Sequence, residues 1–506
     1  MQQTTTPPIR RIDPHDNVAV ALRDLPVEEK IFFPEGDGTR TVTLTVTEPI
    51  VAGHKVALGD LPADAEVIKY GHPIGRTTQP VPAGAWVHSH NMASSLAGIE
   101  TYHYAPRPDE AISPALGELH FDGYLRPNGR AGIRNEIWVI VTVGCCNPVA
   151  EALVREARLV FAERGIDGIF HFPHPFGCSQ LGDDLANTRR ILAGLVRHPN
   201  AGGVLVMGLG CENNHLDHFQ TLLDDAERVR FYNLQEVEDE IEHGLELLAE
   251  LIDRAEKNKR QSLPAGKLVL GMKCGGSDAF SGITANPLLG EVADTLIQLG
   301  GSVILTEVPE MFGAETILMN RCKDRATFAK TVALIDAFKA YFMRHDQAVY
   351  ENPSPGNKAG GITTLEEKSL GCIRKGGRSP VVDVHAYGAQ IVNPGLSLLN
   401  GPGNDIVSTT ALAAAGAQMV LFTTGRGTPL GGPVPTLKIA SNTALAARKK
   451  HWIDFDAGRL LGGEEMAAVT NALLQVIAES ASGRRPCRNE VMGSREIAIF
   501  KDGVTL

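Results

Sequence analysis

Residues 138–146 read WVIVTVGCC, an apolar and β-branched run that ends in a glycine and two cysteines. Residues 204–212 (VLVMGLGCE) and 268–278 (LVLGMKCGGSD) follow the same format. Such runs are typical of strands that are buried on both faces of a parallel sheet. Ligands of open α/β sheets bind just beyond the carboxyl ends of the strands, so these polar loops indicate an enzyme active site. The alternative is that they are ordinary turns between strands and helices.

The arrangement of the elements predicts an α/β protein with a small β module at its start. Helical patterns at residues 148–163 and 181–197 alternate with the strands, which favours mainly parallel sheets with crossover helices. A chain of 506 residues exceeds what one core usually holds. We expect four parts: a small all-β module (1–92), a linker (93–119), a first α/β domain (120–262) and a second α/β domain (263–506).

Composition restricts the class of partner. A net charge of -11 argues against nucleic acid and anionic membranes, so a small molecule is the expected partner. Residues 1–8 lack the features of a secretory signal and no apolar run approaches the length of a membrane span, which predicts a cytoplasmic protein. None of the eight cysteines forms a Cys-x-x-Cys pair, so we expect reduced thiols. Association into a homo-oligomer stays open.

Several longer motifs carry a resemblance that covers the whole chain. Residues 16–20, 52–58 and 87–91 (VHSHN) resemble a SAF (antifreeze-like) domain. The remainder is similar to the altronate dehydratase and galactarate dehydratase family, through residues 134–136 (RNE), 208–214 (GLGCENN), 275–278 (GGSD), 281–287 (SGITANP), 351–361 (ENPSPGNKAGG) and 422–429 (FTTGRGTP). Residues 87–91 and 497–506 look more like the altronate branch.

The resemblance implies removal of water from D-altronate to give 2-dehydro-3-deoxy-D-gluconate, with Fe²⁺ or Mn²⁺ as cofactor. The C2 proton of the substrate is barely acidic, so a Lewis acid has to stabilise the charge that develops on the carboxylate. A base then removes this proton while an acid protonates the departing C3 hydroxyl. The alternatives are dehydration of galactarate or another aldarate, a sulfo-lyase reaction on sulfolactate, and a sugar-acid-binding protein without turnover.

Two sets of residues are candidate metal ligands. The first comprises His54, His88 and His90, because imidazoles suit Fe²⁺ and alternate residues of a strand share one face. The alternative for these histidines is a solvent-facing or hydrogen-bonded role. The rival set consists of thiols that follow predicted strands: Cys145, Cys178, Cys211 and Cys274. Convergence at one sheet edge would hold iron or an iron-sulfur cluster, although no known cluster spacing is present and buried cysteines often serve only as small apolar residues.

Acid, base and substrate contacts are expected from the same loops. The candidates for proton transfer are Glu212, Asp278, Glu307, Glu310 and Lys358. Arg426, between two glycines, is suited to clamp the substrate carboxylate, and Asn286 and Asn357 to bind hydroxyls. The alternatives are solvated charges, loop-bracing hydrogen bonds and turn residues. Gly275 and Gly276 are not accompanied by a nucleotide-binding pattern, so no nucleotide cofactor is expected.

Overall fold

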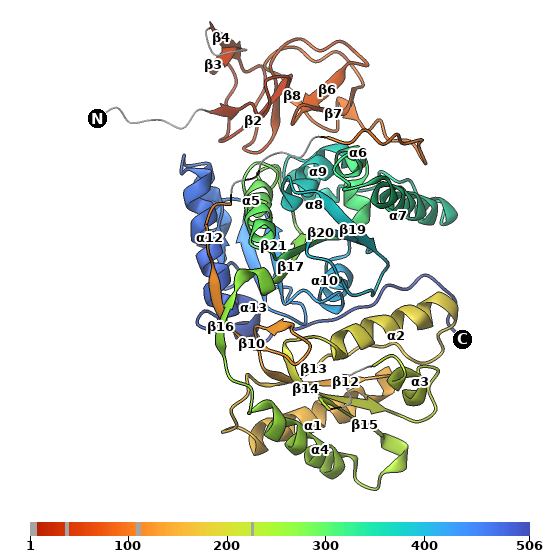
Figure 1. Cartoon of the computed structure of the whole chain (residues 1–506). Helices are drawn as coiled ribbons and strands as arrows, with labels where there is room; N and C mark the ends of the chain where they lie inside the picture. The colour runs from red at the N-terminus through yellow and green to blue at the C-terminus, as the bar shows by residue number, and fades with distance from the viewer. Residues whose placement is uncertain (1–7, 36–39, 108–111, 113, 224–226) are drawn as a thin grey trace.

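The computed structural model describes residues 8–35, 40–107, 112, 114–223 and 227–506, which form three tiers (Figure 1). A β module lies at one end, a large α/β layer lies in the middle and a smaller α/β layer lies at the other end. The predicted α/β class, with an amino-terminal β module and mainly parallel sheets, is confirmed. Among the described residues, no helix has both the length and the apolar character that crossing a bilayer requires.

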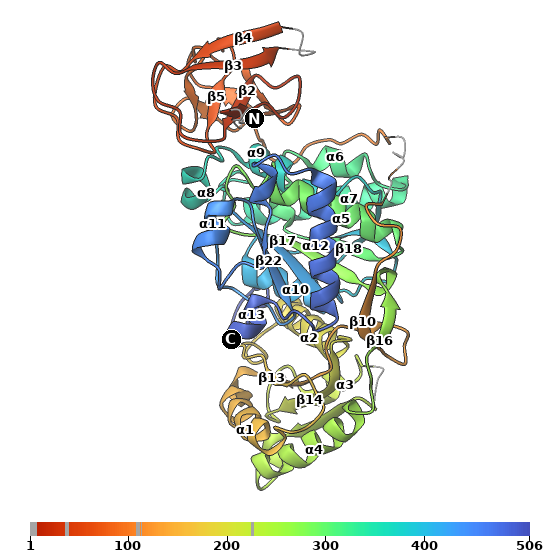
Figure 2. The same ribbon diagram turned by 90° about the vertical axis from the view of Figure 1, so that its left-hand side faces the viewer.

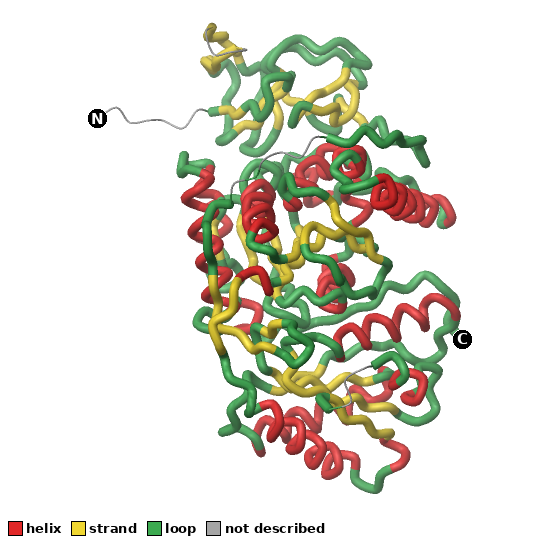
Figure 3. Tube along the Cα trace, viewed as in Figure 1, coloured by secondary structure: helices red, strands yellow, loops and turns green. Residues whose placement is uncertain are grey.

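The amino-terminal module is built from short antiparallel strands. Its sheets have the orders β1-β2-β5-β8, β3-β4 and β6-β7-β9, and the described residues up to 93 contain no helix (Figure 3). The side chains of Val18, Val67, Ile74 and Val87 fill its core. The strands are β1 (Ile9–Arg10), β2 (Val18–Ala21), β3 (Lys30–Glu35), β4 (Arg40–Thr45), β5 (Lys55–Ala57), β6 (Glu66–Lys69), β7 (His72–Thr77), β8 (Trp86–Val87) and β9 (Met92–Ala93).

The segment after the module crosses the surface of the middle tier. Its described residues between 94 and 119 form no helix or strand. Tyr102 donates a hydrogen bond to Glu315 at 2.7 Å, and Tyr104 donates one to the carbonyl of Cys322 at 2.7 Å. These contacts fix the segment against helices α6 (Glu315–Met319) and α7 (Arg325–Arg344).

The smaller α/β layer contains the first of the predicted strands. Its four parallel strands have the order β13-β12-β14-β15. Helices α1 and α4 cover one face and α2 covers the other. The predicted helices at 148–163 and 181–197 are confirmed as α1 and α2. The elements are β12 (Glu136–Val141), α1 (Asn147–Val160), β13 (Ile169–His171), α2 (Gly182–Val196), β14 (Ala201–Gly208), α3 (Leu216–Gln220), β15 (Val229–Asn233) and α4 (Glu240–Ala255).

The middle tier contains a seven-stranded parallel sheet with the order β19-β20-β18-β17-β21-β22-β23. Figure 2 shows α12 lying along this sheet. The strands are β17 (Val269–Cys274), β18 (Ser302–Leu305), β19 (Val381–His385), β20 (Gly395–Leu399), β21 (Met419–Thr424), β22 (Thr436–Ala440) and β23 (Phe455–Asp456). The further helices are α5 (Ala285–Gln298), α8 (Pro355–Ala359), α9 (Leu365–Cys372), α10 (Asp405–Ala414), α11 (Thr443–Arg448), α12 (Met466–Ala481) and α13 (Arg488–Met492). A small sheet of β11 (Ala131–Gly132), β10 (His120–Leu125) and β16 (Gln261–Pro264) lies beside these tiers.

Helices α2 and α10 separate the two parallel sheets, as Figure 1 shows. They approach closely because small residues face each other: a Cβ added at Gly194 would lie 2.5 Å from the carbonyl oxygen of Ala414. In each sheet the chain changes direction across one strand. In the large sheet, β18 lies on one side of β17 and β21 lies on the other. In the smaller sheet, β13 lies on one side of β12 and β14 lies on the other. Ligands of open α/β sheets bind at such switch points, so each sheet offers one favoured position.

Candidate active site

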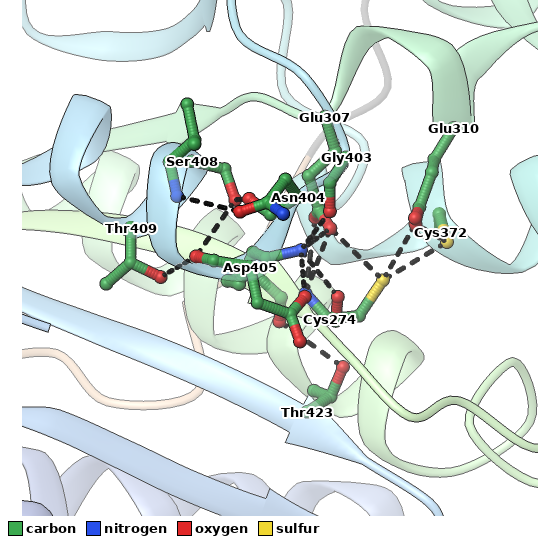
Figure 4. Close-up of polar contacts among 12 residues, drawn as sticks. Cys274, Glu307, Glu310, Cys372, Gly403, Asn404, Asp405, Ser408, Thr409 and Thr423 are labelled. Carbon is green, nitrogen blue, oxygen red and sulfur yellow. Dashed lines mark hydrogen bonds and ion pairs between the residues drawn. The ribbon is translucent and has the colours of Figure 1, made fainter. Parts of the chain in front are cut away.

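Three potential metal ligands meet at the switch point of the large sheet (Figure 4). Cys274 ends β17, Glu310 lies in the 3-10 turn η4 (Val308–Met311) after β18, and Cys372 ends α9. The two sulfur atoms lie 3.3 Å apart, and each lies 3.2 Å from Oε2 of Glu310. All three residues are at most 5% exposed. Among the described residues, this is the group of three His, Cys, Asp or Glu side chains whose ligand atoms lie within 4.8 Å of one another.

Buried lysines surround this cluster. Lys368 donates to Oε1 of Glu310 at 2.9 Å, so the other carboxylate oxygen is left facing the two sulfur atoms. Lys375 pairs with Glu307 at 2.6 Å, and Lys273 pairs with Glu307 and, at 2.9 Å, with Asp405. Each ammonium therefore has a carboxylate partner, which is the condition under which charges are tolerated in a core.

Glu307 adopts a left-handed backbone conformation, with φ 66° and ψ 48°. A residue other than glycine seldom adopts this conformation, and it costs about 1–3 kcal/mol unless the surroundings impose it. The ion pairs with Lys273 and Lys375, together with hydrogen bonds from the backbone N–H of Cys274, hold the side chain in place. Strain of this kind is concentrated at functional sites.

The protonation states follow from these contacts. Burial opposes the charged form of Glu310, but Lys368 and Lys273 hold the pKa of its carboxyl well below the usual range. Burial likewise opposes the charged form of Lys368, but Glu310 raises the pKa of this ammonium. The hydrogen bond with Cys274 and burial raise the pKa of the Cys372 thiol well above its usual value. Without a cation, Cys372 is therefore a neutral thiol.

The donor set fits a divalent transition metal. Two thiol sulfurs and one carboxylate oxygen match the preferences of iron or zinc, and three protein ligands leave a coordination position open. A metal ion displaces the thiol protons when it binds, so the raised pKa of Cys372 makes binding dependent on pH. Lys368 orients Glu310 from outside the ligand group, as outer partners of metal ligands commonly do.

A small cavity adjoins the cluster at the boundary with the β module. Lys69 and Tyr70 of the module line it together with Asp278, Lys368 and Cys372 of the middle tier. Its volume is ≈ 10 Å³, which corresponds to about one water molecule. A ligand larger than water therefore needs more space at this boundary than this closed arrangement provides.

A buried charge network fastens the module to the middle tier. Glu367 of α9 accepts hydrogen bonds from Lys55 and Lys69 of the module, both at 2.7 Å, and the three side chains are at most 1% exposed. Burial opposes its charged form, but the two lysines lower the pKa of Glu367 to about 2. Burial lowers the pKa of Lys55 to about 8.

The predicted histidine ligands lie at the same boundary but in a different arrangement from the one expected. Nδ1 of His54 accepts a hydrogen bond from Trp86 at 3.0 Å, and its Nε2 lies 3.4 Å from the carbonyl oxygen of Ala359. His88 stacks on Trp86 and contacts Thr363 at 3.1 Å through Nδ1, whereas His90 is exposed. These three imidazoles are not a ligand group within 4.8 Å. Burial lowers the pKa of His88 to about 4, so this ring is neutral.

The predicted cysteine set is divided between the two sheets. Cys274 is buried at the end of β17, whereas Cys145, Cys178 and Cys211 are exposed in loops of the smaller sheet. The four thiols do not converge at one sheet edge, as a single site would require, because the strands that precede them belong to two sheets with α2 and α10 between them.

Most of the other predicted site residues have hydrogen-bond partners within the protein. Asp278 accepts hydrogen bonds from Ser281, Ser441 and Asn442, and burial raises its pKa. Asn286 bonds to the carbonyl of Gly371 and to Thr423. Both side chains connect separate loops at the carboxyl end of the large sheet. Such bracing of loops was the alternative role expected for these residues.

Asn357 and Glu212 have comparable roles in separate tiers. Asn357 forms a capping box with Ser354 and donates to the carbonyl of Ser277 at 2.8 Å. Glu212 accepts hydrogen bonds from Thr142 at 2.5 Å and from two backbone N–H groups of its own loop, which lies in the smaller tier. Glu212 therefore belongs to a different part of the molecule from the Cys274 cluster.

Arg426 and Lys358 lie where a solute can reach them. Arg426 is exposed, and a Cβ added at Gly356 of α8 would lie 3.9 Å from its Nε. Lys358 is half-buried on the same helix. Together they form a positively charged margin beside α8, on the surface next to the module boundary.

Comparison with known proteins identifies the family. The model of the altronate/galactarate dehydratase SAF domain matches residues 8–95, that of the D-galactarate dehydratase/altronate hydrolase second domain matches 123–256, and that of the D-galactarate/altronate dehydratase C-terminal domain matches 265–505. An altronate dehydratase of Escherichia coli (strain K12) is 51% identical over 97% of this chain and 98% of its own length. The chain belongs to the altronate/galactarate dehydratase family.

Two further members of the family help to place the chain within it. An altronate dehydratase of Bacillus subtilis (strain 168) is 50% identical over 98% of this chain and 99% of its own length. A galactarate dehydratase (L-threo-forming) of Escherichia coli (strain K12) is 32% identical over 99% of this chain and 98% of its own length. The chain is thus more similar to these altronate dehydratases than to the galactarate dehydratase.

Four residues of the candidate site around Cys274 were not singled out from the sequence. Cys372 ends a helix rather than following a strand, so the strand-end format did not point to it. Lys273 lies inside β17, and Lys368 and Lys375 lie in or next to α9. The sequence offered one signal for these residues, the lysine at 273 next to Cys274. A lysine within an apolar strand needs a buried carboxylate partner.

Proposed function

We propose that this chain removes water from D-altronate to give 2-dehydro-3-deoxy-D-gluconate. The observation that carries the proposal is the identity of 51% and 50%, over nearly the whole chain, to two proteins named altronate dehydratase. The identity to the galactarate dehydratase is 32%, which favours altronate over galactarate as the substrate.

Cys274, Glu310 and Cys372 are the residues that would hold the metal ion, with Fe²⁺ as the proposed ion and Mn²⁺ as the alternative. When bound, such an ion supplies Lewis acidity toward the carboxylate and a neighbouring hydroxyl of the substrate. Lys368 keeps Glu310 oriented toward the two sulfur atoms. Lys273 and Lys375 place buried ammonium groups beside the cluster, and their charge balances that of Glu307 and Asp405.

Lys368 is the proposed proton donor to the departing C3 hydroxyl. Glu310 raises its pKa, so it carries a proton at neutral pH. Asn352 accepts a hydrogen bond from its Nζ at 2.9 Å, which fixes the direction of the ammonium together with Glu310. It also lines the cavity next to Cys372.

The base has to be unprotonated at neutral pH. Burial lowers the pKa of both His54 and His88, so both imidazoles are neutral. Both ring nitrogens of His54 are engaged, Nδ1 by the N–H of Trp86 and Nε2 by the carbonyl of Ala359, so His88 is the better placed acceptor. Thr363 contacts both His88 and Lys55, and Lys55 pairs with Glu367 in the helix that also carries Lys368. We therefore assign proton removal at C2 to His88.

The test is turnover of four solutes by one preparation loaded with Fe²⁺ under reducing conditions: D-altronate, galactarate, sulfolactate and D-gluconate as a non-substrate. We expect release of one 2-keto product per altronate, and kcat/KM for altronate ~10²-fold or more above that for galactarate. Equal kcat/KM for the two acids, or a preference for sulfolactate, contradicts the proposal. Binding of altronate without a 2-keto product would indicate a sugar-acid-binding protein instead.

A further inference from the structure

Three Gly-Cys pairs lie at the carboxyl ends of adjacent strands in the smaller sheet. Gly144-Cys145 follows β12, Gly177-Cys178 follows β13 and Gly210-Cys211 follows β14. These strands are neighbours in the order β13-β12-β14, and β12 is the strand across which the chain changes direction. The three cysteines therefore lie where an open α/β sheet binds its ligand.

The register of the strands aligns two of the cysteines. Val141 of β12 pairs with Met207 of β14, and Cys145 and Cys211 each come four residues after that pair. Adjacent strands are about 4.8 Å apart, so equivalent positions just beyond them are close in space.

Hydrogen bonds lock the three loops together around Asn214. Its backbone N–H donates to the carbonyl of Gly177 at 2.9 Å, and its Nδ2 donates to the carbonyl of Thr142 at 2.9 Å. The N–H of Gly144 donates to the carbonyl of Phe176 at 2.9 Å. Asn214 thus links the Cys211 loop to the two other loops, and the bond between Gly144 and Phe176 links those two loops to each other.

Gly177 allows the closest of these approaches. Its φ is +103°, and an added Cβ would lie 2.0 Å from the carbonyl oxygen of Thr142. Only glycine fits between these loops, which brings the backbone before Cys178 directly against the backbone before Cys145.

The exposure of these cysteines sets them apart from the other five. All eight are free thiols, and Cys145, Cys178 and Cys211 are the exposed ones, whereas Cys146, Cys274, Cys322, Cys372 and Cys487 are buried. A buried cysteine acts as a small apolar residue, but packing does not account for three exposed thiols at one sheet edge. Exposed thiols are available to a ligand.

Positive groups at this edge oppose the negative charge of Glu212, which follows Cys211 in the chain. Helix α1 begins two residues after Cys145 and α2 begins four residues after Cys178, so both present the positive ends of their dipoles there. Arg189 of α2 donates to the carbonyl of Asn213 at 2.7 Å and places a guanidinium beside the Cys211 loop. A group held by thiolates carries net negative charge, which these elements stabilise.

We propose that Cys145, Cys178 and Cys211 hold an iron-sulfur cluster of the [4Fe-4S] type, through three thiolates. The ligands of one ion crowd together, but these three thiols do not lie within 4.8 Å of one another. The ligands of a cluster bind different irons and stand farther apart, which suits three separate loops. Three thiolates leave one iron without a protein ligand, free to bind an oxygen of a solute. This site is distinct from the Cys274 cluster and does not depend on the proposed function.

The test is anaerobic reconstitution of the full chain with Fe³⁺, sulfide and excess dithiothreitol, which reduces half of the iron, followed by measurement of protein-bound iron, acid-labile sulfide and visible absorption. We expect about four labile sulfides per chain, with the broad charge-transfer absorption of thiolate-ligated clusters. The triple variant Cys145→Ser, Cys178→Ser, Cys211→Ser should retain less than about a tenth of this sulfide, because a neutral hydroxyl is a poor replacement for a thiolate. Its thermal unfolding should stay close to that of the wild type, since all three side chains are exposed.

A matched control is the double variant Cys274→Ser, Cys372→Ser, which should retain the labile sulfide of the wild type. Labile sulfide below one per chain in the reconstituted wild type overturns the proposal, as does equal sulfide in the triple variant. Iron or zinc that binds to these cysteines without sulfide would show a metal site of a different kind and overturns the cluster.

Discussion

The sulfur atoms of Cys274 and Cys372 lie 3.3 Å apart, although 98 residues separate them in the chain. Glu310 completes the group, with Oε2 at 3.2 Å from each sulfur. Buried thiols and a carboxylate at these distances share either protons or a metal ion. The lysines around them are each paired with a carboxylate, so the ligand atoms stay free to face one another.

The first prediction concerns metal binding. In protein loaded anaerobically with Fe²⁺ and no sulfide, Cys274→Ser and Cys372→Ser should each lower the affinity for iron by at least tenfold, because each removes a thiolate ligand. Cys322→Ser is the control, since this buried thiol contacts Thr331 instead. Iron titration followed by elemental analysis measures the effect. Unchanged affinity in both ligand variants would rule out this site.

The second prediction separates the thiol ligands from the histidines. His88→Ala should keep the iron affinity of the wild type, because His88 contacts Trp86 and Thr363 rather than the Cys274 group. Its kcat should fall if this imidazole is the base. His54→Ala should lower kcat less than His88→Ala does, because both ring nitrogens of His54 are engaged by Trp86 and Ala359. Loss of bound iron in either histidine variant would support the histidine ligand set instead.

The third prediction concerns the proposed acid. Lys368→Met removes the ammonium but keeps most of the apolar stem, so kcat should fall by about 10²–10⁴-fold. The exposed Lys330, which pairs with Asp383, provides the control variant Lys330→Met, for which we expect unchanged kcat. Steady-state kinetics with altronate measures both. If Lys368→Met raises only KM, this lysine binds substrate rather than donating a proton.

The fourth prediction tests how the module is fastened. Glu367→Gln leaves Lys55 and Lys69 buried without a carboxylate, which should lower the free energy of unfolding by about 3–5 kcal/mol. Glu66→Gln breaks the exposed pair with Arg76 and should change the free energy of unfolding by at most about 1 kcal/mol. Urea denaturation measures both. Equal effects of the two variants would show that the buried network does not stabilise the boundary.

The fifth prediction concerns acid stability. Burial lowers the pKa of His88 to about 4 in the folded protein, from 6.5 when exposed. Between these values the unfolded state binds more protons, so the stability that His88 contributes is present above pH 6.5 and is lost as the pH falls toward 4. The free energy of unfolding should therefore fall less steeply from pH 6.5 to 4.5 in His88→Asn than in the wild type.

Three other buried or half-buried histidines also reduce the stability of the folded protein on acidification. Burial lowers the pKa of His171 and of His174 to about 4, and that of His198 to about 3. Because these residues are present in both proteins, their contribution cancels in the comparison. Parallel curves of stability against pH for the wild type and His88→Asn would contradict the assignment.

Local sequence patterns determined the architecture. The run of apolar and β-branched residues at 138–141, with a glycine at 144, predicted the strand β12, and the helical periodicity of 148–163 and 181–197 predicted two of the helices that flank the smaller sheet. The strand-end format also pointed to Cys274 and to the loop of Glu307 and Glu310, which the structure places in one candidate site. These features depend on neighbours in the chain, which a single sequence displays.

Tertiary structure alone decided which of these residues meet. Cys372 joins Cys274 because α9 packs against η4, a contact between segments far apart in the chain. His54 was an expected ligand, but a hydrogen bond from Trp86 occupies its Nδ1. Cys274 separates from the other three predicted cysteines because β17 and β12 belong to different sheets. Residue type and strand position determine what a side chain can do, whereas the packing of distant segments determines which partners it has.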